Sequence, residues 1–380
     1  MKQIILHIQN GGKGTDIIFP CEEYMLSKSL KKIGIGDAVF GNRYAAEVVE
    51  PKEFVVLENH PLDLDEVNYL AKLMDREDAT EKKTLFAVAA YEGYDTPKEL
   101  INLHFNLGCY TLIQPTDNTE VIGRRYMYSK KPGMTWTEME NTDFEKIGKE
   151  LLDSGKGIQT AYGTLIRNED VEEKEYYDGQ VFPEYHYKGE GLLSVSAEYK
   201  DKREYLYLPA EPEAITKALH RLGAENPEDC TYHMHRFYSV EGLEWMGRFE
   251  EMLQRENIFE VNSVAEKLND WDVDLNKLDG IVRYAGDDSI KTILKLAEYL
   301  DEFEFVERAE NYEDVGQYAV DITFGSGIPD ELEEHIDLNS VGRHMEEEYE
   351  GRFVKGGFVY NNKKRCIEEV LEDARELKIR

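Results

Sequence analysis

The chain has 380 residues, of which 41% are hydrophobic and 11% aromatic, enough to build the cores of two or three globular domains. It carries 45 basic and 78 acidic residues, a net charge of −33, and such a surface repels nucleic acids and anionic membranes. No apolar run reaches the roughly 20 residues of a membrane-spanning helix, and the N-terminus becomes polar too early for a signal peptide. We therefore expect a cytoplasmic protein whose partners are basic proteins.

One sequence pattern occurs twice, about half the chain apart. Residues 19–22, Phe-Pro-Cys-Glu, recur as residues 208–211, Leu-Pro-Ala-Glu, at a shift of 189. Three further matches at shifts of 193 or 194 pair Glu66-Val67-Asn68 with Glu260-Val261-Asn262, Gly123 with Gly316, and Asp143 and Gly148 with Asp337 and Gly342. Four matches in one order indicate a tandem duplication of a folded unit rather than a short-period solenoid.

The first predicted elements are a hairpin and a short helix. Ile4, Leu6 and Ile8 alternate with polar neighbours before a glycine-rich turn at residues 10–14, and the second strand returns to Phe19. An amphipathic helix follows, with apolar residues three or four positions apart. Residues 191–222 repeat this plan in the second unit.

A helical stretch comes next, at about residues 63–126 and again at 259–320. Thr96-Pro97-Lys98-Glu99 has the form of a capping box with Pro at the first helical position, so we predict that a helix begins at Pro97. Each unit then ends with one further helix and a short strand pair. After the second unit, a solvated C-terminal helix is expected near residues 366–377.

This order of elements predicts an α+β fold of two tandem units. Each unit has a hairpin and helix domain, a helical bundle domain and a small α+β C-terminal domain. The predicted boundaries are 1–60, 61–128 and 129–168 for the first unit, 169–190 for a linker, 191–257, 258–320 and 321–362 for the second unit, and 363–380 for a C-terminal helix.

The acidic residues are concentrated in the second half of the chain. Residues 1–50 hold six acidic and six basic side chains, whereas residues 301–350 hold 17 acidic and two basic ones. Self-repulsion of this size lowers stability, although acidic surfaces also serve solubility alone. The acidic residues in this segment recur at helix-like spacings, which predicts ridges of carboxylates on helix faces. At the charge density of DNA, 33 net charges match roughly 56 Å of duplex, or about 16 base pairs.

Several stretches resemble the ArdA antirestriction proteins. In the first unit these are residues 64–71, Leu-Asp-Glu-Val-Asn-Tyr-Leu-Ala, residues 98–110 and residues 122–126, Ile-Gly-Arg-Arg-Tyr. In the second unit, residues 328–332, Ile-Pro-Asp-Glu-Leu, and 341–343, Val-Gly-Arg, resemble the C-terminal piece of the family. The second unit departs where Gly316-Gln317-Tyr318 replaces Gly-Arg-Tyr, so the two units need not function alike.

The resemblance implies an elongated, three-part, non-enzymatic protein of phages and mobile elements, acting in the cytoplasm of the bacterial host. Such proteins mimic bent B-form DNA, occupy the DNA groove of type I restriction-modification enzymes, and generally act as homodimers. Two units in one chain would form a covalent pseudo-dimer, active as a monomer or a homodimer. The predicted phosphate-mimicking carboxylates are Asp63, Asp65, Glu66, Asp75, Glu77, Asp78, Asp301, Glu302, Glu304, Glu307, Glu310, Glu313, Asp314, Asp330, Glu331, Glu333, Glu334, Glu346 and Glu347.

Two other functions stay open at this point. The first is DNA mimicry against a different target, such as a CRISPR effector, another nuclease or a nucleoid protein. The second is an acidic adaptor that binds a basic protein away from its DNA site. An adaptor would bind its target together with DNA, whereas a mimic would compete with DNA.

Catalytic, cofactor and metal sites are not predicted. The four cysteines, Cys21, Cys109, Cys230 and Cys366, form no CxxC pair, so we expect thiols rather than a disulfide framework or a zinc ribbon. Cys230, His233 and His235 have the composition of a zinc site but no counterpart in the first unit. Residues 270–281 lack the Gly and Glu of an EF-hand loop, and residues 11–15 lack the P-loop spacing. HExxH and GxSxG motifs are absent from the sequence.

Overall fold

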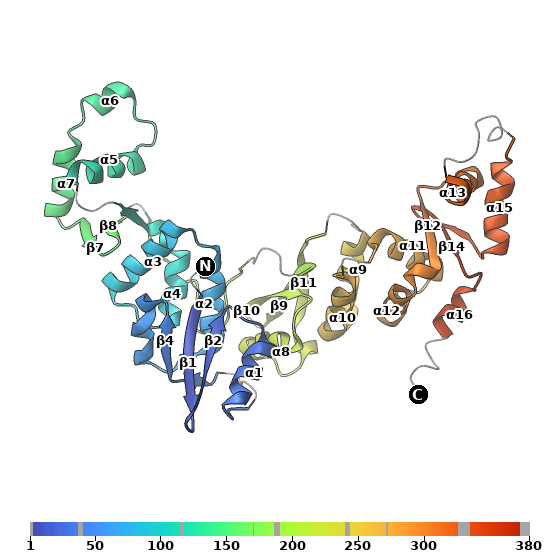
Figure 1. The fold of residues 1–380 in the computed structure, drawn as a ribbon, viewed down its shortest axis with the longest axis horizontal. Helices are drawn as coiled ribbons and strands as arrows, with labels where there is room; N and C mark the ends of the chain where they lie inside the picture. Colours follow the sequence, from blue (N-terminus) through green and yellow to red (C-terminus); the bar gives the residue numbers. More distant parts are fainter. Residues whose placement is uncertain are drawn as a thin grey trace. The chain divides into compact units, whose positions relative to one another are not determined.

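The computed structural model describes residues 3–36, 41–114, 118–169, 171–185, 191–239, 244–270, 273–325 and 335–372 (Figure 1). The chain forms two compact units. Unit 1 contains residues 1–187 and Thr216–Leu222, and unit 2 contains residues 188–215 and 223–380. Both units combine helices with small antiparallel sheets, so the predicted α+β fold is confirmed.

Unit 1 begins with a three-stranded sheet in the order β2-β1-β4. The hairpin turn needs only Gly11 and Gly12, which both have a positive φ that favours glycine. Ile4 pairs with Phe19, and Leu6 with Ile17, so all four side chains point into the core. The elements are β1 (Ile4–Asn10), β2 (Lys13–Phe19), α1 (Glu23–Lys32), β3 (Arg43–Tyr44), β4 (Ala46–Glu50), η1 (Lys52–Asn59) and β5 (Leu62–Asp63).

Three helices follow, and polar side chains fix where each of them begins. Asp63 caps α2 (Leu64–Arg76), and Asp78 forms a capping box with Glu81 at the start of α3 (Ala79–Glu92). Thr96 and Glu99 form the predicted capping box of α4 (Pro97–Phe105), with Pro97 in the first turn. The predicted start of this helix is therefore confirmed.

The last part of unit 1 is a helix pair beside a second sheet, in the order β6-β8-β7. Helices α5 and α7 cross in close backbone contact. A Cβ added at Gly123 would lie 1.9 Å from the carbonyl oxygen of Phe144, and one at Gly148 would lie 1.9 Å from that of Thr119. The elements are η2 (Leu107–Cys109), β6 (Tyr110–Ile113), α5 (Thr119–Lys130), α6 (Trp136–Glu140), α7 (Phe144–Asp153), β7 (Gly157–Thr160) and β8 (Gly163–Arg167).

Residues 171–185, within the predicted linker, form neither helix nor strand but are bound along unit 1. Asn106 of unit 1 accepts a hydrogen bond from the backbone N–H of Lys174 (3.0 Å) and donates one to its carbonyl (2.8 Å). Asn102 does the same for Tyr177, at 3.0 and 2.8 Å. The ring of Phe182 stacks on Tyr69 at 4.4 Å. This stretch, which we call the strap, is therefore held both through its own backbone and through its aromatic side chains.

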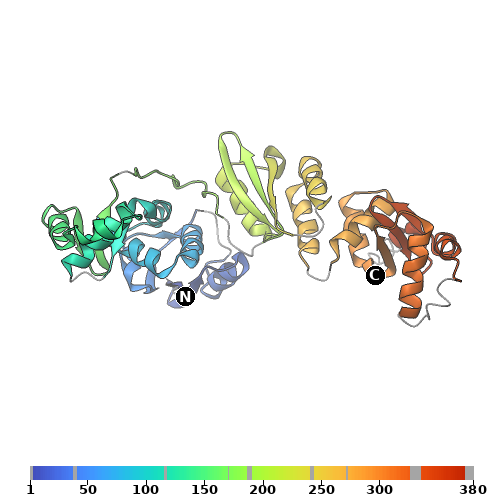
Figure 2. The ribbon, with the colours of Figure 1, turned by 90° about the horizontal axis from the view of Figure 1, so that it is seen from above.

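Unit 2 repeats the kinds of element found in unit 1, and its chain order can be followed by colour in Figures 1 and 2. Its sheets have the orders β10-β9-β11 and β12-β14-β13. The elements after the strap are β9 (Leu193–Tyr199), β10 (Lys202–Leu208), α8 (Pro212–Leu222), η3 (Pro227–Asp229), β11 (Thr231–Phe237), α9 (Glu244–Arg255), α10 (Ile258–Leu268), α11 (Leu275–Ala285), α12 (Ile290–Glu298), η4 (Leu300–Glu302), β12 (Phe303–Glu307), α13 (Tyr312–Phe324), α15 (Leu338–Glu348), β13 (Arg352–Val354), β14 (Gly357–Asn361) and α16 (Ile367–Glu372). All of them belong to unit 2 except residues Thr216–Leu222 of α8, which belong to unit 1.

Two local contacts of unit 1 recur in unit 2. Asn68 hydrogen-bonds both the N–H and the carbonyl of Cys21, and Asn262 does the same with Ala210, all at 2.8 to 2.9 Å. Helices α13 and α15 cross as α5 and α7 do, since a Cβ at Gly316 or Gly342 would lie 1.9 Å from a backbone carbonyl oxygen of the other helix.

The C-terminal helix α16 spans Ile367–Glu372, and residues 373–377 of the predicted helix lie outside the described residues. It is not entirely solvated, because Val370 is fully buried. Within the described ranges, none of the helices combines the length and apolarity that crossing a bilayer requires.

The glycine crossing predicts a specific loss of stability. In Gly316→Ala the new methyl group would meet the carbonyl oxygen of Leu338 at 1.9 Å, so the two helices must separate. We expect the free energy of unfolding, measured by urea denaturation, to fall by about 1–3 kcal/mol. Gly247→Ala in α9, where nothing lies within 4 Å, is the matched control and should raise it by about 0.5–1 kcal/mol. Equal stability of the two variants would contradict this account.

Candidate functional site

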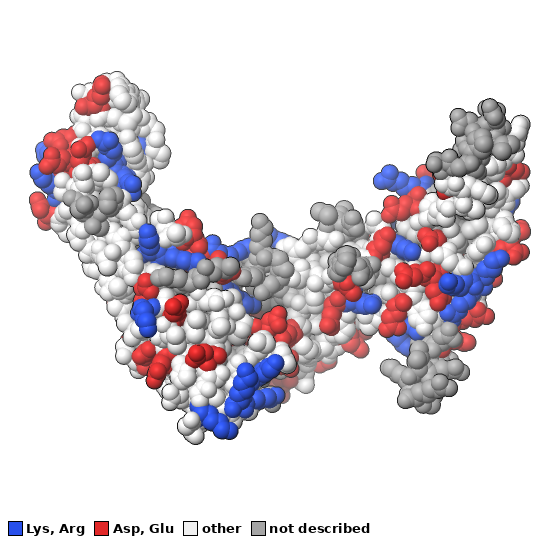
Figure 3. All heavy atoms as spheres, in the orientation of Figure 1, with Lys and Arg blue, Asp and Glu red and all other residues white. Residues whose placement is uncertain are grey.

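Five of the predicted carboxylates of unit 2 are exposed, and among the described residues none of them has an ion-pair partner. They are Asp301, Glu307, Glu310, Glu313 and Glu347. The first three lie in η4, at the end of β12 and before α13, and the other two lie on α13 and α15. Figure 3 shows acidic side chains gathered over α11 and β12 of this unit. Such carboxylates can accept bonds from a partner without first breaking a bond within the protein.

The remaining described candidates of unit 2 already hold internal bonds. Glu302 pairs with Arg365 at 3.1 Å. Glu304 accepts from the hydroxyl of Tyr318 (3.2 Å), and burial together with this carboxylate raises the pKa of Tyr318 to about 12. Asp314 forms the capping box of α13, and Glu346 accepts from a tyrosine hydroxyl of that helix at 2.7 Å. Asp330, Glu331, Glu333 and Glu334 lie outside the described residues.

The candidates of unit 1 are mostly engaged in the fold. Asp63 and Asp78 cap α2 and α3. Glu66 and Glu77 are buried, and they accept hydrogen bonds from the Tyr177 hydroxyl (3.0 Å) and the His104 ring (2.6 Å). Asp75 is half-buried and has a partner. A partner protein would have to break these bonds in order to use the carboxylates.

Asp65 belongs to a buried ion cluster of unit 1. The ammonium group of Lys217, which is 5% exposed, bonds Asp65 and lies 2.6 Å from a carboxylate oxygen of Glu23. Burial alone would lower the pKa of Lys217, but the two carboxylates raise it, so the side chain stays charged. Lys217 lies in the second half of the sequence, and it neutralises two carboxylates that lie in the first half. Asp65 therefore stabilises unit 1, and its charge is already compensated.

Sequence reasoning missed Asp321, an exposed carboxylate on α13. It accepts a hydrogen bond from the side-chain amide of Gln317 at 2.9 Å. A signal was present, because Glu313 and Asp321 are eight residues apart and such positions share a helix face. The net charge is also larger in the second half of the chain: residues 188–380 carry −21, whereas residues 1–187 carry −12.

Among the described residues, no group of three His, Cys, Asp or Glu side chains is arranged to hold a metal ion. Cys230 is buried, whereas His235 is exposed and its ring bonds the hydroxyl of Ser196 at 2.9 Å. All four cysteines are thiols.

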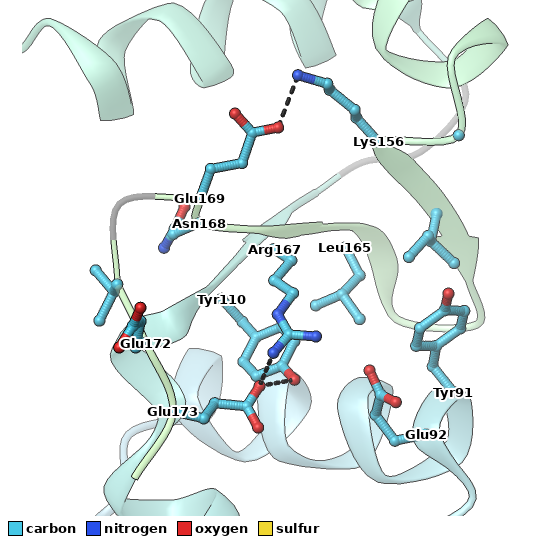
Figure 4. A pocket seen from close by; sticks show the side chains of 13 residues that line it. Tyr91, Glu92, Tyr110, Lys156, Leu165, Arg167, Asn168, Glu169, Glu172 and Glu173 are labelled. Carbon is cyan, nitrogen blue, oxygen red and sulfur yellow. Dashed lines mark hydrogen bonds and ion pairs between the residues drawn. The ribbon is translucent and has the colours of Figure 1, made fainter.

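A cavity of about 730 Å³ lies in unit 1 between α3, β8 and the chain that leaves β8 (Figure 4). Its two cations are paired within its own wall, Arg167 with Glu173 (3.1 Å) and Lys156 with Glu169 (2.7 Å). The hydroxyl of Tyr110 also donates a hydrogen bond to Glu173. Burial and this carboxylate raise the pKa of Tyr110. These bonds tie the chain after β8 to the sheet. The charged groups that line the cavity therefore stabilise the fold, and they do not indicate a ligand site.

The comparisons with known proteins bear on the second half of the chain. Residues 202–360 match the family described as antirestriction protein (ArdA). The matched range includes the exposed carboxylates on β12, α13 and α15. No curated protein matches the chain.

The burial of Glu66 leads to a pH-dependent prediction. Burial, and then the neighbouring Asp63, raise the pKa of Glu66 in the folded state. A group with a raised pKa in the folded state stabilises the protein fully at a pH below its pKa in the unfolded chain. This contribution is lost as the pH rises through its pKa in the folded protein. We expect Glu66→Gln, which keeps an acceptor for Tyr177, to raise the free energy of unfolding at pH 7.5 on the order of 1 kcal/mol. The gain should shrink as the pH falls to 4.5, and urea denaturation at both pH values measures it.

Tyr177→Phe is the control for this prediction. It removes the donor and leaves the buried carboxylate of Glu66 unsatisfied, so we expect a loss of about 1–3 kcal/mol at pH 7.5. A gain in Glu66→Gln that does not change with pH would argue against the raised pKa.

Proposed function

We propose that the chain inhibits type I restriction-modification enzymes by mimicking DNA, because residues 202–360 match the ArdA antirestriction family. Exposed carboxylates of unit 2 stand in for phosphates in the DNA-binding groove of the target. The observation that carries this proposal is a set of three exposed carboxylates, Asp301, Glu307 and Glu310, which have no ion-pair partner among the described residues and lie on or beside helices and strands within the matched region. The protein acts by occupying the groove, and no catalytic step is required.

The physical basis is competition for the same cations. A DNA-binding groove places Lys and Arg side chains opposite phosphates, and binding releases the counterions of both surfaces. A carboxylate that already has a Lys or Arg partner adds little to such an interaction, because that partner must first be displaced. The mimicry therefore depends on unpaired carboxylates rather than on the total acidic count.

We also propose that the chain is a tandem duplication that works as a covalent pseudo-dimer. Three features support this: the equivalent strand orders of the two pairs of sheets, the matching roles of Asn68 and Asn262, and the glycine crossings. Joining two units in one chain raises the effective concentration of the second. The target then needs no association of two separate chains.

The test is the plating efficiency of an unmodified phage on cells with a type I restriction system. We expect the wild-type chain to restore plating. The triple variant Asp301→Asn, Glu307→Gln, Glu310→Gln should lose at least roughly tenfold of that effect, since each lost phosphate-like contact removes about one released counterion. The matched control Glu120→Gln, Glu145→Gln, Glu150→Gln makes the same charge change at carboxylates that are paired in unit 1. It should keep the effect within a few-fold.

Two results would overturn this proposal. One is a soluble, folded wild-type chain that gives no rescue. The other is a purified chain that binds the restriction enzyme together with DNA, as an adaptor would. Equal inhibition by the triple variant and the wild type would show that these three carboxylates are not the phosphate surrogates.

A further inference from the structure

The two units carry the same helix crossing in different electrostatic settings. In both, each glycine contacts the carbonyl of the residue four positions before the other glycine: Gly123 and Gly148 in α5 and α7, Gly316 and Gly342 in α13 and α15. The four Cβ distances are all 1.9 Å, so the backbone approach is equally close in the two pairs. A difference between the pairs must therefore come from their side chains.

The α5–α7 pair of unit 1 neutralises its own charge. Glu120 pairs with Arg124 one helical turn later, Glu145 with Lys149 (2.7 Å) and Glu150 with Lys146 (3.8 Å). Residues 118–167, which run from this pair to the end of β8, hold seven acidic and eight basic side chains. This part of unit 1 offers a basic groove almost no net attraction.

The corresponding part of unit 2 holds few basic side chains. Residues 311–361 hold 12 acidic and three basic side chains. Ser340 stands where unit 1 has Lys146, and it hydrogen-bonds Asp337. Arg343 stands where unit 1 has Lys149, and it lies over the ring of Tyr312 at 4.7 Å.

Position 317 is where the two pairs differ most directly. It follows Gly316 as Arg124 follows Gly123, and it lies four residues after Glu313 as Arg124 lies four after Glu120. Gln317 is neutral, and its amide bonds Asp321. The carboxylate of Glu313 therefore stays exposed without a cation of its own helix, among the described residues.

We propose that the α13–α15 pair binds the basic groove of the target and that the α5–α7 pair does not. This inference rests on the proposed function and names the part of the chain that carries it out. Two observations support it: the family match covers α13 and α15, and the same crossing is charge-balanced in unit 1. Gly316 and Gly342 are positioning residues, because their contact sets how far apart the carboxylates of the two helices stand.

The experiment exchanges the charge at the equivalent positions of the full chain. Gln317→Arg places the unit 1 residue beside Glu313 and Asp321, and Arg124→Gln makes the reverse change in unit 1. Binding to a purified type I methyltransferase is measured by displacement of a DNA duplex at several salt concentrations. We expect Gln317→Arg to weaken binding at least about tenfold and to lower the salt slope by roughly one to two. Arg124→Gln should stay within twofold of wild type.

Further variants separate charge from side-chain size and from folding. Gln317→Met is neutral and should bind like wild type, with thermal unfolding confirming that all variants are folded. Glu313→Gln and Glu120→Gln give a second matched pair, in which only the first should weaken binding. This inference would be overturned if Gln317→Arg and Arg124→Gln had equal effects, or if Gln317→Arg bound like the wild type. The proposed function would still stand in both cases, provided that the wild-type chain displaces DNA. If the wild-type chain displaces no DNA, the proposed function itself fails.

Discussion

The close contact between two helix backbones, made possible by a pair of glycines, is the constraint on which the end of each unit depends. Gly316 and Gly342 leave no room for a side chain, since a Cβ at either position would lie 1.9 Å from a carbonyl oxygen. The helices are therefore positioned by their backbones rather than by the identity of their outer side chains. As a result, α13 and α15 can carry a dense set of carboxylates without losing their arrangement, and α5 and α7 can carry mixed charges on the same frame.

A carboxylate in this protein has one of two roles, and its environment decides which. Asp63 and Asp78 satisfy the N–H groups at helix starts, and Asp65 compensates a buried ammonium group. These groups stabilise the fold because they are bonded, and the same bonds reduce their value to a partner. Asp301 and Glu307 have the opposite character: they add repulsion to the isolated protein and stay accessible to an external cation. A high acidic count is thus a weak guide to the binding surface.

The sequence predicted the kinds of element and the start of α4, and it matched the glycines of one copy to those of the other, because periodicity, capping residues and repeats can be read without knowing long-range contacts. It did not predict that these glycines hold pairs of helices together. It did not distinguish Glu66 from an exposed acid, because its burial depends on Tyr177, which is more than one hundred residues away in the sequence. The strap was equally hidden. Asn102 and Asn106 bind backbone atoms, so the bound residues show no pattern of their own. The inclusion of Thr216–Leu222 in unit 1 likewise depends on long-range contacts.

The electrostatics of unit 2 link its stability to its binding. Residues 301–350 hold 17 acidic and two basic side chains, and their mutual repulsion lowers the stability of the isolated unit. A basic groove would supply the missing cations and so reduce the repulsion between the carboxylates. Binding would therefore raise the apparent stability of the protein. Salt would then act in opposite directions on the two equilibria. Screening weakens the repulsion within the unit and so favours folding, but it also weakens the attraction to the target. A surface kept acidic only for solubility would show the first effect without the second.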